Sequence, residues 1–154
     1  PGSTAAIPAT LLAQAKSGVC FRPASGKYSW SREFKFQWLL DREQLACQFR
    51  CESIDRAGSF FFLVERETEP IPYQDSYAQL HTLRLQAPVT LISTLPVQCA
   101  AKIASQGTRT SKGSWSGEIL PGESCKLSLA LERALQLQLS LYGRNLWSEP
   151  VTIW

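Results

Sequence analysis

Side chains that commonly carry chemistry are scarce in this 154-residue sequence, which contains one histidine and no methionine. Because His81 is the single imidazole, a Ser-His-Asp or Cys-His arrangement could form at one place only, and metal sites with several histidines are excluded. Neither a P-loop nor a G-x-G-x-x-G motif is present. We therefore expect a protein that is not an enzyme and that uses no metal and no cofactor.

The sequence also lacks a strong excess of charge of one sign and a long apolar run. Its formal net charge is +3, whereas a nucleic-acid-binding surface favours a dense basic stripe. The longest apolar candidate, residues 59–64, has the length of a strand and not the roughly 20 residues of a transmembrane helix. Because 44% of the residues are hydrophobic, we expect a packed globular core and no nucleic-acid partner.

The number of cysteines is odd, which argues against a complete disulfide framework. In a strand, the Cα atoms of Cys47 and Cys51 would lie about 13 Å apart, whereas a disulfide needs less than about 7 Å. The single asparagine, Asn145, starts no N-glycosylation sequon. We therefore expect free, buried thiols and a cytoplasmic location. The five thiols belong to Cys20, Cys47, Cys51, Cys99 and Cys125.

The start of the sequence carries no initiating methionine, so we expect a piece of a longer protein. Residues 1–4 resemble a cloning remnant, and residues 5–154 are expected to form the folded all-β region. Within it, residues 5–15 could form either a short helix or a fraying end.

Alternation of apolar and polar residues is the dominant pattern and is clearest from Leu135 to Leu141. This period predicts strands that place one face on a core. Residues 127–141 are rich in helix-favouring residue types, but we expect the alternation to prevail over that propensity. The strands predicted from alternation cover residues 34–38, 83–86, 126–131 and 135–141. Further strand candidates cover residues 19–22, 45–51, 59–65, 89–92, 97–104 and 151–154.

Glycine, proline and polar residues separate these segments. Turns are predicted at residues 25–26, 56–58, 121–122 and 142–145, a loop at residues 67–77 because of Pro70 and Pro72, and a mobile loop at residues 105–114. Many short strands with frequent turns favour an all-β fold, and we expect an antiparallel β-sandwich repeat unit.

Two Trp-Ser pairs near the ends of the chain suggest about one repeat unit followed by the edge of a neighbouring one. Trp30-Ser31 and Trp147-Ser148 are each followed by apolar residues four and six positions after the tryptophan. We interpret Trp30, Ser31, Trp147 and Ser148 as structural residues where strands enter the core. The run Phe60-Phe61-Phe62 cannot face a single core, so at least one ring should cover a second layer or an interface.

The segments that carry a family resemblance, in order, are Phe21-Arg22-Pro23, Tyr28-Ser29-Trp30-Ser31-Arg32, Leu45-Ala46-Cys47, residues 60–65, residues 83–89, Leu95-Pro96, Leu120-Pro121-Gly122 and residues 147–153. Together they resemble the adaptor-binding region of the vacuolar protein sorting thirteen family. Members of that family are very large cytosolic proteins that bridge organelles and move lipids between them. The resemblance covers most of the chain, from Ser17 to Trp154.

This resemblance implies a string of β-sandwich repeats that recognises short proline-containing peptides on organelle adaptor proteins. The full-length protein would then associate peripherally with organelle membranes and contact sites. The resemblance places the peptide site at Leu91, Ser93, Leu95 and Pro96, where addition of the peptide to a sheet edge is physically reasonable. Repeats of the family carry asparagine at the position of Ser93. Serine offers fewer hydrogen-bonding groups, so the repeat could also lack a ligand.

Three other hypotheses about the function stay open. The chain could be a structural spacer repeat without a ligand. The Trp-Ser pairs also suggest an extracellular fibronectin-like receptor domain. A bacterial surface pilin or adhesin is a further reading. The cysteine pattern disfavours both extracellular alternatives.

Overall fold

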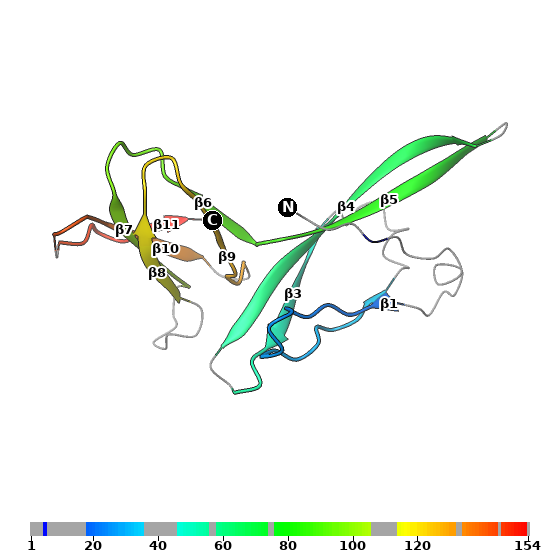
Figure 1. Cartoon of the computed structure of the whole chain (residues 1–154), viewed down its shortest axis with the longest axis horizontal. Helices are drawn as coiled ribbons and strands as arrows, with labels where there is room; N and C mark the ends of the chain where they lie inside the picture. The colour runs from blue at the N-terminus through cyan, green and yellow to red at the C-terminus, as the bar shows by residue number, and fades with distance from the viewer. Residues whose placement is uncertain are drawn as a thin grey trace.

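Every regular element in the described part of the chain is a β-strand (Figure 1). The computed structural model describes residues 5, 18–35, 46–55, 58–73, 76–105, 114–131, 134–144 and 146–153. The predicted all-β, antiparallel class is therefore confirmed. The strands are β1 (Gly18–Val19), β2 (Phe34–Lys35), β3 (Ala46–Glu52), β4 (Ser59–Tyr73), β5 (Ser76–Gln86), β6 (Val89–Ile92), β7 (Cys99–Ser105), β8 (Ser114–Ile119), β9 (Ser124–Leu127), β10 (Leu135–Leu141) and β11 (Val151–Ile153).

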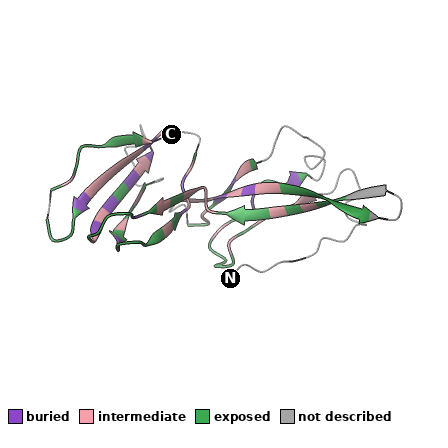
Figure 2. Ribbon diagram, turned by 90° about the horizontal axis from the view of Figure 1, so that it is seen from above, coloured by how far each residue is buried: buried purple, intermediate pink, exposed green. Residues whose placement is uncertain are grey.

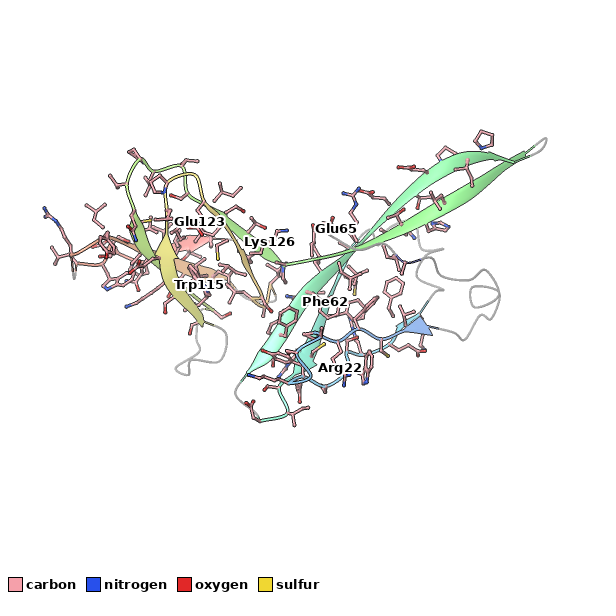
Figure 3. All side chains as sticks on the ribbon, viewed as in Figure 1. Arg22, Phe62, Glu65, Trp115, Glu123 and Lys126 are labelled. Atoms are coloured by element: carbon pink, nitrogen blue, oxygen red, sulfur yellow. The ribbon has the colours of Figure 1, made fainter. Side chains whose placement is uncertain are left out.

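Strands β1 to β5 form the N-terminal lobe, residues 18–86, whose core is aromatic. An antiparallel sheet of order β3-β4-β5 lies beside the short β1-β2 pair. Phe49 and Phe62 stack with ring centroids 5.6 Å apart, and burial of each such ring contributes about 2–3 kcal/mol. Figure 3 labels Phe62 in this lobe. The buried members of the cluster are Phe34, Phe49, Cys51, Phe62 and Val64.

Strands β6 to β11 form the C-terminal lobe, residues 89–153, which is built from two sheets. One sheet has the order β11-β10-β7-β8, and the other is the β6-β9 pair. Ile103 of β7, Leu127 of β9 and Leu135 of β10 share one buried cluster, so the two sheets enclose a common core. Figure 2 shows buried residues, coloured purple, along the strands of this lobe. The arrangement is that of a small β-sandwich.

The two lobes meet at Pro88, where the chain passes from β5 to β6. Pairing of β4 with β5 ends at Leu63 opposite Gln86, and the same register would place Pro88 opposite Phe61. Proline has no N–H group to continue the ladder. The hydroxyl of Ser128 takes its place: it accepts from the N–H of Phe61 at 2.6 Å and donates to the carbonyl of Phe61 at 2.8 Å.

A second contact between the lobes comes from the amide of Gln48 on β3. Its Nε2 donates to the Leu129 carbonyl at 3.0 Å, and its Oε1 accepts from the Leu131 N–H at 3.2 Å. The main chain after β9 is therefore held by Ser128 and Gln48 together. Phe62 lies in the aromatic core and Phe60 packs against it. The backbone of Phe61, between them, takes part in this junction.

The predicted loop at residues 67–77 is wrong, because β4 and β5 pair without interruption from Leu63–Gln86 to Tyr73–Ser76. Pro70 and Pro72 lie within β4 at alternate positions. Past Glu65 no described strand pairs with the other side of β4, so a proline there can direct its missing N–H position outward. Figure 1 shows this part of the hairpin extending past β3.

Other strand predictions differ mainly in length. Residues 89–92 and 135–141 coincide with β6 and β10, whereas β9 ends at Leu127 and β8 was missed. The predicted turns around Gly26, Gly122 and Gly143 are present, and each of these glycines has a positive φ. Residues 1–4, 6–15, 36–38, 56–57, 106–113, Asn145 and Trp154, on which other predictions fall, lie outside the described residues.

Candidate functional site

The predicted peptide-binding segment begins in β6 and continues into the loop that follows it. Val89 and Leu91 pack against the C-terminal core, whereas the intervening Thr90 and Ile92 are exposed. Leu91 also contacts the second cluster of that lobe, formed by Cys99, Ala101 and Ile119. Leu91 is therefore a half-buried core residue. Its neighbour Ile92, which is 61% exposed, presents the apolar surface at this place.

Ser93 is bound through its backbone, but its side chain has no hydrogen-bond partner among the described residues. Its N–H donates to the Glu123 carbonyl at 2.9 Å, and its carbonyl accepts from the Gly122 N–H at 3.0 Å. The residue is only 7% exposed, and its Oγ makes no hydrogen bond. A buried hydroxyl without a partner costs about 1–3 kcal/mol. Figure 3 labels Glu123, which immediately precedes β9, and Lys126, which lies within β9.

The outer edge of β6 is open among the described strands. The backbone of Ser93 points toward residues 122–123, so the residues two and four positions earlier point the same way, toward β9. The N–H and C=O groups of Thr90 and Ile92 then point to the opposite side, where no described strand pairs. Such an edge can accept a further strand.

Exposed apolar side chains follow this edge along the chain. Leu95, Pro96 and Val97 are exposed, and the next residue, Gln98, accepts a hydrogen bond from the Tyr142 N–H at 3.2 Å. Tyr142 is itself exposed. The open edge of β6 thus continues into a partly apolar end of the lobe.

The two Trp-Ser serines make the same hydrogen bonds in the two lobes. Ser31 donates its N–H to the Phe21 carbonyl at 2.8 Å, and its Oγ accepts from the Phe21 N–H at 3.0 Å. Ser148 repeats both bonds with Leu139, at 2.8 and 3.1 Å. Each hydroxyl also donates to the next carbonyl in the chain, that of Arg32 or Glu149.

The surroundings of these pairs are repeated as well. The Arg22 guanidinium lies 4.5 Å from the centroid of the Trp30 ring, and the Lys102 ammonium lies 3.7 Å from that of Trp147. Trp30 is exposed, so it contributes to a surface cation–π contact and not to the interior. The shared local structure of the two lobes explains why the Trp-Ser pair recurs in the sequence.

The cysteines form no disulfide, but the expectation of uniformly buried thiols is wrong. Cys51 and Cys99 are buried, Cys47 and Cys125 are half-buried, and Cys20 is exposed. Cys51 donates through its Sγ to the Phe21 carbonyl at 3.4 Å, and desolvation by burial raises the pKa of this thiol. Cys20 directly follows β1, which ends at Val19, and is exposed.

Groups that could support catalysis are dispersed in the part of the chain that is described. His81 lies on β5, with its Nδ1 3.1 Å from the Thr68 hydroxyl. Within the described ranges no group of three His, Cys, Asp or Glu side chains could hold a metal ion. The same ranges contain no helix with the length and apolar composition needed to cross a membrane.

The residues that sequence reasoning missed at this site are Ile92 and the Gly122–Glu123 backbone. The turn signal Pro121-Gly122 was recognised, but nothing in its composition reveals that it binds the backbone of Ser93. Comparison with known proteins adds no assignment: no family model matches this sequence, and no curated protein matches it significantly.

Proposed function

We propose that this chain is a non-enzymatic interaction module that binds short proline-containing peptides of organelle adaptor proteins. In this proposal it belongs to a large cytoplasmic lipid-transfer protein that acts at membrane contact sites. The observation that carries the proposal is the buried Ser93 hydroxyl, which has no partner and lies next to the open edge of β6.

The peptide would bind by adding a strand to β6. Its backbone would pair with the N–H and C=O groups of Thr90 and Ile92, and its apolar side chains would contact Ile92 and Leu95. A proline fits in such a strand wherever its missing N–H would point away from β6. Pro70 and Pro72 already occupy positions of this kind in β4.

Ser93 would supply a specific polar contact. Because its Oγ is buried without a hydrogen bond, a donor or acceptor brought in by the peptide would relieve an existing cost. The asparagine found at this position in the resembling family would offer both an amide and a carbonyl. On this proposal, Ser93→Asn would strengthen peptide binding.

A binding titration with labelled proline-containing adaptor peptides tests the proposal. Ile92→Asp places a charge at the open edge and should weaken binding about tenfold or more. Leu146→Asp is the matched control, because Leu146 is 74% exposed and lies outside the strands, and it should leave the affinity unchanged. Failure of every peptide to bind the folded chain, or equal losses in the two variants, would overturn the proposal.

A spacer repeat without a ligand is the alternative supported by a specific observation. Leu91 contributes to the core, and Gln48 and Ser128 connect the two lobes through hydrogen bonds, which suits a rigid connecting element. Absence of peptide binding, together with normal folding of the chain, would favour this alternative.

A further inference from the structure

The outer edge of β5 is the longest open strand edge among the described residues. All eleven residues of β5 pair with β4, and β5 is the last strand of its sheet. The N–H and C=O groups of Phe61 point toward the side of β4 on which β5 lies. Because this direction alternates along a strand, the backbone groups of the other odd-numbered residues of β4 also point toward β5. Their partners on β5 are the even-numbered residues. The backbone groups of Gln79, His81, Leu83 and Leu85 therefore point outward.

This edge lacks the protection that the opposite side of the hairpin has. Beyond Glu65, the open side of β4 carries Pro70 and Pro72, which remove two outward N–H groups. The sequence of β5 contains neither proline nor glycine. Proteins usually block long edge strands with proline, charge or a covering segment. Among the described strands none pairs with this edge, so it marks a place for strand addition.

One face of the hairpin is acidic. Glu65, Glu67 and Glu69 alternate along β4 and therefore project to the same face, opposite Arg84, Thr82 and Leu80 of β5. Arg84 pairs with Glu67 at 2.9 Å. Arg50 of β3 also projects from this face of the sheet, but it pairs with Glu52 on the same face at 3.2 Å. Among the described residues, Glu65 and Glu69 therefore leave the hairpin part of the face with negative charge.

The other face is apolar near the core. Leu83 packs against the aromatic cluster of the N-terminal lobe, and Leu85 is 51% exposed on the same face. A strand beside β5 would cover the exposed part of these leucines. A strand added beside β5 would therefore need basic side chains on the acidic face and apolar side chains on the apolar face.

We propose that the outer edge of β5 binds an extended segment of a partner protein in which basic and apolar residues alternate. Its basic residues lie on the face of Glu65 and Glu69, and its apolar residues lie against Leu83 and Leu85. Two inter-strand spacings, about 10 Å together, separate the added strand from β4. A lysine or arginine and a glutamate that lean toward each other can span this distance. The site is distinct from the β6 edge and does not depend on the proposed adaptor function.

Synthetic ten-residue peptides of alternating lysine and valine are a suitable probe, with alternating glutamate and valine as the charge control. Fluorescence anisotropy with the whole chain should detect binding of the lysine peptide. The glutamate peptide should bind at least about tenfold more weakly, and added salt should weaken the lysine peptide. Equal binding of the two peptides, or no binding of either, would overturn the proposal.

The edge itself is tested by His81→Pro. Proline at this position removes an outward N–H and leaves the pairing with β4 intact, whereas His81→Ala removes the same side chain and keeps the N–H. The proline variant should lose about tenfold in affinity and the alanine variant should not. The double variant Glu65→Gln and Glu69→Gln should abolish the preference for lysine. Thermal unfolding of each variant establishes that it is folded, and a folded proline variant with unchanged affinity would exclude this edge.

Discussion

Ser31 and Ser93 are equally buried serines with opposite hydrogen-bonding states. Ser31 is 6% exposed, and its Oγ accepts from the Phe21 N–H and donates to the Arg32 carbonyl. Ser93 is 7% exposed, and its Oγ has no partner. The same residue type at the same depth therefore stabilises the N-terminal lobe and destabilises the C-terminal one.

Replacement of each serine by alanine should separate these two effects. Ser31→Ala leaves the Phe21 N–H without its side-chain partner and should lower the free energy of unfolding by about 1–3 kcal/mol. Ser93→Ala removes an unsatisfied hydroxyl and should leave the free energy of unfolding unchanged or raise it by up to about 1 kcal/mol. Urea titrations of the two variants check this, and a clear destabilisation by Ser93→Ala would mean that its hydroxyl is bonded in solution.

Loss of the Ser128 hydroxyl should weaken the junction between the lobes. Ser128→Ala removes both hydrogen bonds to the Phe61 backbone at the point where Pro88 cannot supply them. We expect the Phe61 amide to exchange its hydrogen at least about tenfold faster, since that loss corresponds to roughly 1–1.5 kcal/mol. Ser124→Ala on β9, where the serine is exposed, is the control. Equal exchange in the two variants would show that the junction does not protect this amide.

Thiol reactivity should follow burial and not position in the sequence. Cys20 should react first with a thiol reagent in the folded chain, Cys51 and Cys99 should require unfolding, and denatured protein should show five reactive thiols. A lower count after denaturation without reductant would revive the extracellular fibronectin-like alternative.

The raised pKa of Cys51 also predicts the direction of a pH effect. The unfolded thiol ionises near its ordinary pKa of 9.0, while the buried thiol holds its proton to higher pH. The unfolded state is therefore favoured as the pH rises past the ordinary thiol pKa, and the free energy of unfolding should fall above that pH. Cys51→Ala should reduce this fall, which urea titrations at a series of pH values measure.

The alternating patterns were sufficient to predict the all-β class and the position of β10, because one-sided burial requires period two. They failed at Ser140 and Leu141, where the serine is buried and the leucine exposed. The Ser140 hydroxyl donates to the Arg144 carbonyl at 2.6 Å and so holds the following turn, a local hydrogen-bonding requirement that the hydropathy pattern does not contain.

The position of the candidate site comes from the family resemblance alone and stays a prediction. A resemblance placed it at residues 91–96, yet the division into a core-facing Leu91 and an exposed Ile92 follows from the pairing of β6 with β9. The contacts of Gln48 and Ser128 across the junction were also inaccessible, because they join residues far apart in the chain.

By composition Pro70 and Pro72 indicate a loop, but their place in β4 indicates that they protect an edge. In the double variant Pro70→Val and Pro72→Val, two outward N–H groups return to an edge strand of high β propensity. We expect a larger average mass than that of the parent chain in sedimentation at equal concentration, because edges of this kind pair with each other. Pro150→Val alters an exposed proline outside the strands and is the control. If the double variant and the control sediment like the parent, the prolines tolerate the strand without protecting it.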